Sequence, residues 1–465
     1  MKRPNILLIH TDQQRWDALG INGNQDIHTP NLDRLGKEGI NFDHYFVNNP
    51  VCMPSRVSYL SGLYPSTLGI YRNGVPVSED LQVLPKMLSP YGYVTANIGK
   101  LHFLNHANRD HKDPHPDYGF DHLEISDEPG CYDDAYRAWV RRKAPEQLDK
   151  ISVGLPPATE TWQEAMNIDD NINHPEERFP KKPVPFKADS DLTHSAFVAE
   201  QTVEFLKKHQ DENFFCAAGF YSPHSPWVAP QEYIDKYNPE ELSLPSFPET
   251  VDSKRSEDYF SDEELKLARQ GYYAMVSEVD YQVGKILSEL ENLGLRDNTI
   301  VIFTSDHGEY LGEHLRYGKG TPGYDCVSRV PLIIRWPEVI SETGTFSGLA
   351  EAVDLVPTIL ESAGIQIPYR LQGKSLYPVL TGEKSVTKDT TLLEGEGVKT
   401  LRTRDYRYVV KADGKEMLFD LKNDPGEYNN LAGEPDYDKI LAEMRFKLRQ
   451  HLFDIDRPQK REWPY

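Results

Sequence analysis

The stretch Asn5-Ile6-Leu7-Leu8-Ile9-His10-Thr11-Asp12-Gln13 decides how the rest of this sequence is interpreted. Its first five residues form a continuous apolar run, which is typical of a strand that is buried on both faces of a sheet. Polar residues follow directly, and Asp12 and Gln13 are expected where the strand ends. The stretch therefore predicts an α/β fold whose first strand carries polar side chains to one edge of the sheet.

Four more short apolar runs, at 93–98, 214–220, 299–304 and 331–336, are interpreted as strands. Helical patterns cover 193–208 and 263–293, and another helix opens at Pro30 with Thr29 as its N-cap. Strands that alternate with helices in this way predict a doubly wound, mostly parallel sheet that is sandwiched by helices.

The sequence pattern changes after about residue 390. Apolar or alternating runs at 398–401, 406–410 and 417–421 are separated by turn residues, and a helical pattern follows at 437–453. These features predict a short antiparallel sheet and a helix, hence a smaller C-terminal α+β subdomain over 390–465. Residues 1–389 then form the main domain, within which the Pro-, Asp- and Glu-rich stretch 121–189 is expected to be an insertion near the rim of the site.

Composition excludes several classes of function. The 465 residues include 73 acidic and 51 basic ones, and the resulting net charge of −22 argues against binding to nucleic acid or to an anionic membrane. No apolar run approaches the roughly 20 residues of a membrane span. The first residues lack the apolar region and cleavage site of a secretory signal, so a cytoplasmic location is expected, or a periplasmic or secreted one if a signal was trimmed from this sequence. The four cysteines are widely spaced and predict no disulfide framework.

Two polar pairs occupy matching positions. Asp12-Gln13 follows the first strand, and Asp306-His307 follows the strand predicted at 299–304. Because ligands of open α/β sheets bind beyond the carboxyl ends of the strands, both pairs are expected to face one crevice. A set of mostly oxygen ligands suits Ca²⁺ or Mg²⁺. Either pair alone is as well explained as turn or cap residues, whereas the two together predict a metal site.

The run Cys52-Met53-Pro54-Ser55-Arg56 precedes a short helical pattern over 57–63. Cys52 is therefore expected at or near a helix N-terminus, where backbone N–H groups and the helix dipole favour an anion. A lone buried cysteine is most often structural. The pattern C-x-P-S-R is more specific than that, and it has a mechanistic interpretation.

This run, followed by Leu60-Ser61-Gly62-Leu63-Tyr64-Pro65, resembles the signature of the type I sulfatases of the alkaline-phosphatase superfamily. Further motifs match in the same order: Asn5-Ile6-Leu7-Leu8-Ile9 with Asp12, Thr29-Pro30-Asn31-Leu32-Asp33, Gly99-Lys100-Leu101-His102, Pro223-His224-Ser225-Pro226-Trp227 and Thr304-Ser305-Asp306-His307-Gly308-Glu309. The resemblance covers nearly the whole chain. It implies an alkaline-phosphatase-like fold and the hydrolysis of a sulfate ester, with a sulfated carbohydrate or other sulfated small molecule as substrate.

The resemblance also implies that Cys52 is converted to formylglycine (3-oxoalanine) by a formylglycine-generating or anaerobic sulfatase-maturating enzyme. In the hydrated aldehyde, one oxygen attacks sulfur, and loss of the proton from the other oxygen expels sulfate as the carbonyl reforms. Ca²⁺, or else Mg²⁺ or Mn²⁺, would bind Asp12, Gln13, Asp306, His307 and the modified Cys52.

Five more residues receive roles by the same match. Arg56 would hold the diol, and Lys100 and Lys319 would bind the sulfate oxygens. His102 and His224 are both candidates for protonating or binding the leaving oxygen, and the sequence does not decide between them. These cations and the metal are expected to attract an anionic substrate despite the acidic composition.

Gln13 departs from many family members, which have a second carboxylate at this position. The combination of Asp12-Gln13 with Asp306-His307 is also similar to the phosphonate monoester hydrolases, which use the same formylglycine on phosphonate and phosphate diesters. Their cysteine segment more often has Ala where this chain has Ser55, which favours a sulfatase. A hypothesis from another class is a catalytically silent protein that binds sulfated glycans and keeps Cys52 as a thiol.

Overall fold

The computed structural model describes residues 3–105, 113–153, 163, 164, 167, 181–382 and 388–456. Strand β1 (Asn5–Thr11) lies inside a sheet of eight described strands, in the order β10-β2-β9-β8-β1-β6-β3-β4. The other strands are β2 (Ile40–Phe46), β3 (Tyr93–Gly99), β4 (His122–Ile125), β6 (Asn213–Gly219), β8 (Thr299–Ser305), β9 (Leu332–Arg335) and β10 (Gly344–Glu351). β1 pairs in parallel with both β6 and β8, as the sequence predicts.

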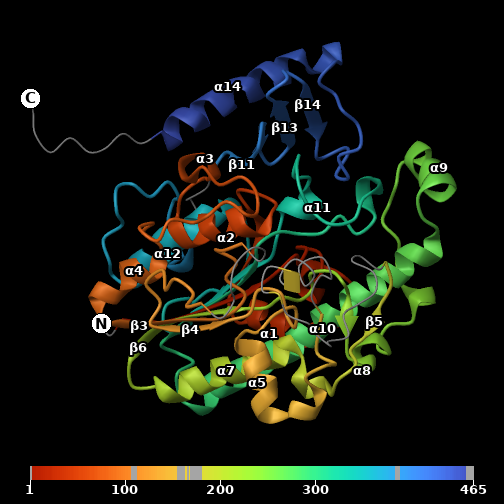
Figure 1. Ribbon diagram of the computed structural model, residues 1–465. Coiled ribbons are helices and arrows are strands. Elements are labelled where there is room, and N and C mark those ends of the chain that lie inside the picture. Colours follow the sequence, from red (N-terminus) through yellow and green to blue (C-terminus); the bar gives the residue numbers. More distant parts are fainter. Residues whose placement is uncertain are drawn as a thin grey trace, which may run out of the picture.

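Alternate residues of β1 reach opposite faces of the sheet, because successive side chains of a strand point to opposite sides. Ile6 and Leu8 belong to one buried apolar cluster, and Leu7 and Ile9 belong to another. Two layers of helices form these cores, and each layer covers one face of the sheet (Figure 1). The continuous apolar run is thus explained by burial on both sides.

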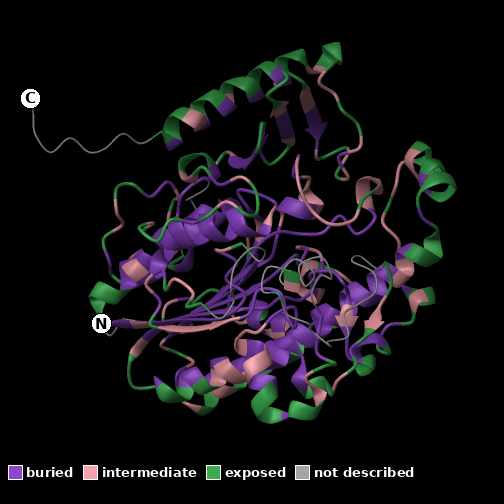
Figure 2. Ribbon diagram, in the orientation of Figure 1, coloured by how far each residue is buried: buried purple, intermediate pink, exposed green. Residues whose placement is uncertain are grey.

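One layer contains α2 (Cys52–Ser61), α4 (Leu84–Leu88) and α12 (Leu355–Ser362). The other contains α1 (Pro30–Lys37), α5 (Ala135–Lys143), α7 (His194–Lys208) and α10 (Asp262–Asn292). Figure 2 shows the sheet and the inner faces of these helices as buried, with exposed residues on the outer surfaces. Further helices are α3 (Pro65–Leu68), α8 (Gln231–Ile234), α9 (Glu249–Asp258), α11 (Asp325–Ser328) and α13 (Tyr377–Leu380). No helix among the described residues combines the length and apolar character that crossing a membrane requires.

The C-terminal part forms a second sheet, which is antiparallel and has the order β11-β12-β13-β14. Its strands are β11 (Thr391–Gly395), β12 (Val398–Arg402), β13 (Tyr406–Lys411) and β14 (Glu416–Asp420). Helix α14 (Asp438–Ile455) packs on this sheet through Leu441, Met444 and Leu448. The predicted α/β fold with a C-terminal antiparallel sheet is confirmed, and the boundary between residues 389 and 390 stays a prediction.

The strand predicted at 331–336 is confirmed as β9, which is antiparallel to both of its neighbours, β8 and β2. One local expectation needs correction. Thr29 occupies the N-cap position of α1 but makes no capping hydrogen bond. Its hydroxyl instead accepts from the Gly20 N–H and donates to Asp33. β2, β4, β10 and β11 were not predicted, because partly polar or short strands give a weak periodic signal.

The stretch 121–189 is only partly described, since 154–162, 165, 166 and 168–180 lie outside the described residues. It begins with β4, which extends the main sheet by pairing in parallel with β3. It also contains α5 and the short strand β5 (Val184–Pro185), which pairs with β7 (Val228–Ala229). The start of the stretch is therefore part of the main sheet.

Candidate active site

The predicted site residues come together at one edge of the main sheet. Asp12 follows β1, Lys100 follows β3, and Asp306 and His307 follow β8. β1 is parallel to β8 and to β6, and β6 is parallel to β3. The carboxyl ends of β1, β3 and β8 therefore lie at the same edge of the sheet. Helix α2 begins at Cys52 and brings this residue to the same place.

Four buried side chains form a compact group of metal-binding atoms. The ligand atoms of Asp12, Cys52, Asp306 and His307 all lie within 4.8 Å of one another. His307 Nε2 is 3.5 Å from Asp12 Oδ1, 3.6 Å from Asp306 Oδ1 and 3.3 Å from Cys52 Sγ. Burial lowers the pKa of His307 to about 4, so its imidazole is neutral near pH 7, as a metal ligand must be.

Gln13 adds an oxygen to this group. Its backbone N–H donates to Asp306 Oδ1 over 3.0 Å, and its side-chain amide donates to Glu309. Its Oε1 is buried and has no hydrogen-bond partner among the described residues. An unpaired buried acceptor is costly unless a ligand satisfies it. Two carboxylates, an amide oxygen and an imidazole thus fit a divalent cation.

Arg56 contacts both carboxylates of the metal-binding group, Asp12 and Asp306. It is completely buried, and its Nε donates to Asp306 Oδ2 over 2.7 Å, while Nη2 lies 3.4 Å from Asp12 Oδ2. His10 and Tyr59 lie behind the guanidinium, since His10 Nδ1 is 3.2 Å from Arg56 Nη1 and 3.1 Å from the Tyr59 hydroxyl. Burial and the Arg56 charge hold the pKa of His10 well below its usual range, so His10 is neutral and its Nδ1, which faces the Arg56 cation, can act as an acceptor.

Lys100 forms an ion pair with the same oxygen of Asp12 that Arg56 approaches. Its Nζ is 2.9 Å from Asp12 Oδ2 and 3.9 Å from Glu128 Oε1, and it lies 4.7 Å from the centre of the Tyr221 ring. Burial by itself would raise the pKa of Asp12, but the surrounding cations, Lys100 first, hold it well below the usual range. Asp12 is therefore ionised and can bind a cation.

Lys319 and His224 are the last two members of the group of side chains around Cys52. The half-buried Lys319 places Nζ 2.6 Å from Cys52 Sγ and 3.1 Å from His224 Nε2. His224 Nδ1 is 2.6 Å from the Ser225 carbonyl oxygen, which can only accept, so the ring proton is on Nδ1. Nε2 is then an acceptor for the Lys319 ammonium, which also donates toward Cys52 Sγ.

The cysteine itself is protonated in its unmodified form. Burial, followed by the negative charge of Asp12, raises the pKa of the Cys52 thiol to about 12. Because the thiolate is the reactive form of cysteine, an unmodified Cys52 is a poor nucleophile near neutral pH.

The two candidate histidines differ in what the structure shows of them. His224 touches Lys319 through its ring. His102 is buried and held by its backbone N–H, which donates to Asp127 Oδ1 over 2.8 Å, and the N–H of Leu101 donates to the same oxygen. Contacts within the site join the following residues: Asp12, Gln13, Cys52, Arg56, Lys100, His224, Asp306, His307 and Lys319. His102 lies two positions after Lys100.

Sequence reasoning missed several residues that support the site. His10, Asp127, Glu128 and Glu309 were given no role, although Glu309 lies within the motif that supplied Asp306 and His307. Asp127 and Glu128 lie just beyond β4, after Ser126, and recognising that strand would have placed them at the same edge of the sheet. Asn73, an exposed residue, accepts a hydrogen bond from the Met53 N–H near the start of α2.

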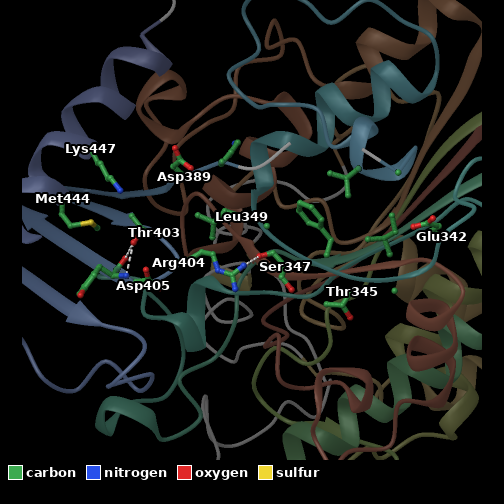
Figure 3. A pocket seen from close by; sticks show the side chains of 18 of the residues that line it. Glu342, Thr345, Ser347, Leu349, Asp389, Thr403, Arg404, Asp405, Met444 and Lys447 are labelled. Atoms are coloured by element: carbon green, nitrogen blue, oxygen red, sulfur yellow. Dashed lines mark hydrogen bonds between the residues drawn. The ribbon is translucent and has the colours of Figure 1, made fainter. Parts of the chain in front are cut away.

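A separate pocket of about 800 Å³ lies between strand β10 and helix α14. Figure 3 shows Leu349 and Ser347 on one side of it and Met444 and Lys447 on the other. Arg404 donates a hydrogen bond to the Ser347 carbonyl oxygen and so links the C-terminal sheet to β10. None of the described residues that line this pocket belongs to the site around Cys52, so the pocket is separate from that site.

Two family models match the sequence. The model described as Sulfatase matches residues 4–365, and the model described as N-sulphoglucosamine sulphohydrolase, C-terminal, matches residues 312–453. Together they cover the main sheet, the site and the C-terminal sheet.

Known proteins agree with this match. An arylsulfatase of Clostridium perfringens is 30% identical, over 97% of this chain and 94% of the relative. An N-acetylglucosamine-6-O-sulfatase of Bacteroides thetaiotaomicron is 29% identical, over 97% and 86%. The crystal structure of a phosphonate monoester hydrolase of Agrobacterium radiobacter superposes with a TM-score of 0.83 at 25% identity, over 97% of this chain and 96% of that one. The chain belongs to the sulfatase family of the alkaline-phosphatase superfamily, and its class is that of the sulfuric ester hydrolases.

Proposed function

We propose that this protein removes sulfate from a sulfated carbohydrate, with Cys52 converted to formylglycine as the nucleophile and with a divalent cation beside it. One observation carries the proposal: Cys52 Sγ, at the start of a helix, contacts both a group of metal ligands through His307 and a cation through Lys319. The atom that marks the proposed nucleophile therefore contacts both a metal ligand and the cation that would bind sulfate.

Cys52 Sγ marks where the oxygens of the formylglycine hydrate would lie. The hydrate would supply an attacking oxygen and a second hydroxyl whose deprotonation releases sulfate. A maturating enzyme must first oxidise Cys52, and no residue described in this chain is assigned that step.

The chain's own side chains have distinct tasks in this proposal. Lys319 places its ammonium beside the nucleophile, where it would bind a sulfate oxygen and stabilise the charge of the transition state. His224 orients Lys319 through Nε2. Arg56 fixes the two carboxylates, Asp12 and Asp306, so that they need no reorganisation when a ligand binds.

Asp12, Gln13, Asp306 and His307 would hold the cation, with the modified Cys52 as a further ligand. When bound, a Ca²⁺, Mg²⁺ or Mn²⁺ ion supplies positive charge that polarises oxygen ligands and screens the charge of the sulfate. Ca²⁺ is the ion that we propose, because the set is dominated by oxygen.

A carbohydrate substrate is proposed from the Bacteroides thetaiotaomicron relative, whose name describes an N-acetylglucosamine-6-O-sulfatase. The overall charge of −22 does not prevent an anionic substrate from binding, since Arg56, Lys100 and Lys319 supply local positive charge.

Phosphonate or phosphate diester hydrolysis is the alternative. It is favoured by Gln13, which replaces a carboxylate, and by the structural similarity to the phosphonate monoester hydrolase. An amide makes the site less negative than a second carboxylate would, so the two activities require direct comparison.

The test has two parts. The protein is produced together with a formylglycine-generating enzyme, and the tryptic peptide that ends at Arg56 is examined by mass spectrometry. Replacement of H₂S by O at Cys52 is expected, and a peptide with only cysteine would contradict the mechanism. Turnover of an aryl sulfate is then compared with that of an aryl phosphonate monoester. A higher kcat/KM for the sulfate is expected, whereas a strong preference for the phosphonate would establish the alternative. Desulfation of a panel of sulfated mono- and oligosaccharides would identify the substrate.

A further inference from the structure

Glu309 lies behind the site and joins two segments that carry site residues. Its carboxylate is buried and accepts a hydrogen bond from the side-chain amide of Gln13. The other carboxylate oxygen accepts from the backbone N–H of Leu311 over 3.1 Å and from the backbone N–H of Gly318. One side chain therefore contacts both the residue after Asp12 and the residue before Lys319.

The contact with Glu309 decides which way the Gln13 amide points. A primary amide has a donor end and an acceptor end, and Gln13 turns its donor end, the NH₂ group, toward a carboxylate oxygen of Glu309. Glu309 therefore holds the NH₂ group of Gln13 and leaves Oε1 on the other side, where it has no partner among the described residues. The backbone of Gln13 is held in place as well. Its N–H donates to Asp306, and its carbonyl oxygen accepts from the Tyr272 hydroxyl over 2.7 Å.

The same carboxylate holds the turn that precedes Lys319. Besides the two N–H groups bound to Glu309, the N–H of Tyr310 donates to the Gly318 carbonyl oxygen over 2.9 Å and closes the loop. Gly318 has φ of +85°, a conformation that favours glycine. Lys319 leaves this loop with Nζ 2.6 Å from Cys52 Sγ.

We propose that Glu309 is a positioning residue that presents the Gln13 amide oxygen to a divalent cation and fixes the loop that carries Lys319. This inference rests on the proposed function, since it places the cation at the Asp12 cluster. Hydrogen-bond partners of metal ligands commonly set ligand orientation, and their loss costs about 10- to 100-fold in metal affinity. In this chain a single carboxylate would perform that task for a metal ligand and for the loop of a sulfate-binding lysine.

Glu309→Gln tests the polarity of the contact. The amide oxygen introduced at position 309 can still accept from Leu311 and Gly318, but its NH₂ group then faces the NH₂ group of Gln13. Gln13 must turn its oxygen away from the cation to restore a hydrogen bond. Calorimetric titration of the metal-stripped full chain with Ca²⁺ should therefore show a Kd that is about 10- to 100-fold higher than that of the unmodified sequence.

The double variant Gln13→Glu with Glu309→Gln is the matched control. It reverses donor and acceptor, conserves the total charge and leaves a carboxylate oxygen of position 13 for the cation. Ca²⁺ affinity is expected to return to within about 3-fold of the original value or to exceed it. Recovery by the swap would show that Glu309→Gln alone had not lost affinity through misfolding.

The outcomes are distinct. Ca²⁺ binding by Glu309→Gln that equals the original would overturn the proposal, and so would a double variant that binds no better than Glu309→Gln. If the original chain itself binds neither Ca²⁺, Mg²⁺ nor Mn²⁺, the proposed function fails, and this inference fails with it. Steady-state kinetics at saturating Ca²⁺ add a readout for the loop, because Glu309→Gln should lower kcat more than it raises KM for an aryl sulfate.

Discussion

Lys319 Nζ lies 2.6 Å from Cys52 Sγ, although 267 positions separate the two residues in the sequence. The contact joins the start of α2 to the loop that follows β8, and it places a cation at the point where the nucleophile is expected. His224 supports the lysine on the other side through Nε2. Four predictions follow from this site and from the framework that holds it.

Cys52→Ala should abolish turnover and leave the fold intact. The change removes the side chain from which the nucleophile is made, so kcat for an aryl sulfate should fall by roughly 10³-fold or more. The thiol is buried but small, and we expect a loss of about 1 kcal/mol in the free energy of unfolding. Circular dichroism and urea unfolding measure the second effect. Substantial remaining turnover would place the nucleophile on another residue.

Lys319→Met should lower kcat by about 10²- to 10³-fold, because it removes one charged hydrogen-bond donor from the transition state and keeps the length of the side chain. Lys285→Met, on the exposed face of α10, is the control and should leave kcat unchanged. Both variants are measured with an aryl sulfate at saturating metal. Equal activity of the two variants would show that Lys319 does not contact the reacting sulfate.

Lys388→Met should destabilise the junction between the main domain and the C-terminal sheet. Lys388 Nζ is 2.5 Å from Glu351 Oε2 and 2.6 Å from Asp354 Oδ1, and both carboxylates are completely buried. Loss of the ammonium leaves two buried carboxylates without their counter-charge, which should cost about 3–5 kcal/mol in the free energy of unfolding. Lys374→Met changes an exposed lysine nearby and should cost less than about 0.5 kcal/mol. Similar urea midpoints for the two variants would argue against a buried ionic contact at Lys388.

Asp280→Asn should change how stability depends on pH. Asp280 accepts hydrogen bonds from the N–H groups of Asn31 and Leu32 at the start of α1, and burial raises its pKa to about 6. An unfolded aspartate titrates near pKa about 4, so the stabilisation that Asp280 contributes is complete below about pH 4 and is lost as the pH rises through about 6.

The free energy of unfolding of the original chain, relative to that of Asp280→Asn, should therefore fall by up to about 3 kcal/mol between pH 4 and pH 7. Urea unfolding at several pH values measures this difference. Asp211→Asn, which replaces an exposed carboxylate, should show no comparable slope. A difference between Asp280→Asn and the original chain that does not vary with pH would contradict the raised pKa.

The sequence alone determined the central strands and the groups at their ends. β1, β3, β6 and β8 are buried on both faces, so each appears as an apolar run that can be recognised without knowledge of its neighbours. Asp12 and Asp306 follow two of these runs directly. Because parallel strands end at the same edge, a local pattern was enough to predict that the two carboxylates meet.

Only the tertiary structure decided which distant groups touch and how the outer strands pair. β9 runs antiparallel between β8 and β2, and a strand's direction does not change its hydrophobic pattern. β10 is exposed over its first residues, so its sequence lacks the apolar run of a buried strand. Glu309 stands next to recognisable motif residues, yet its partners, Gln13 and Gly318, are brought to it by the fold. Local sequence fixes backbone preference and burial pattern, whereas contacts between residues hundreds of positions apart depend on the packing of the whole chain.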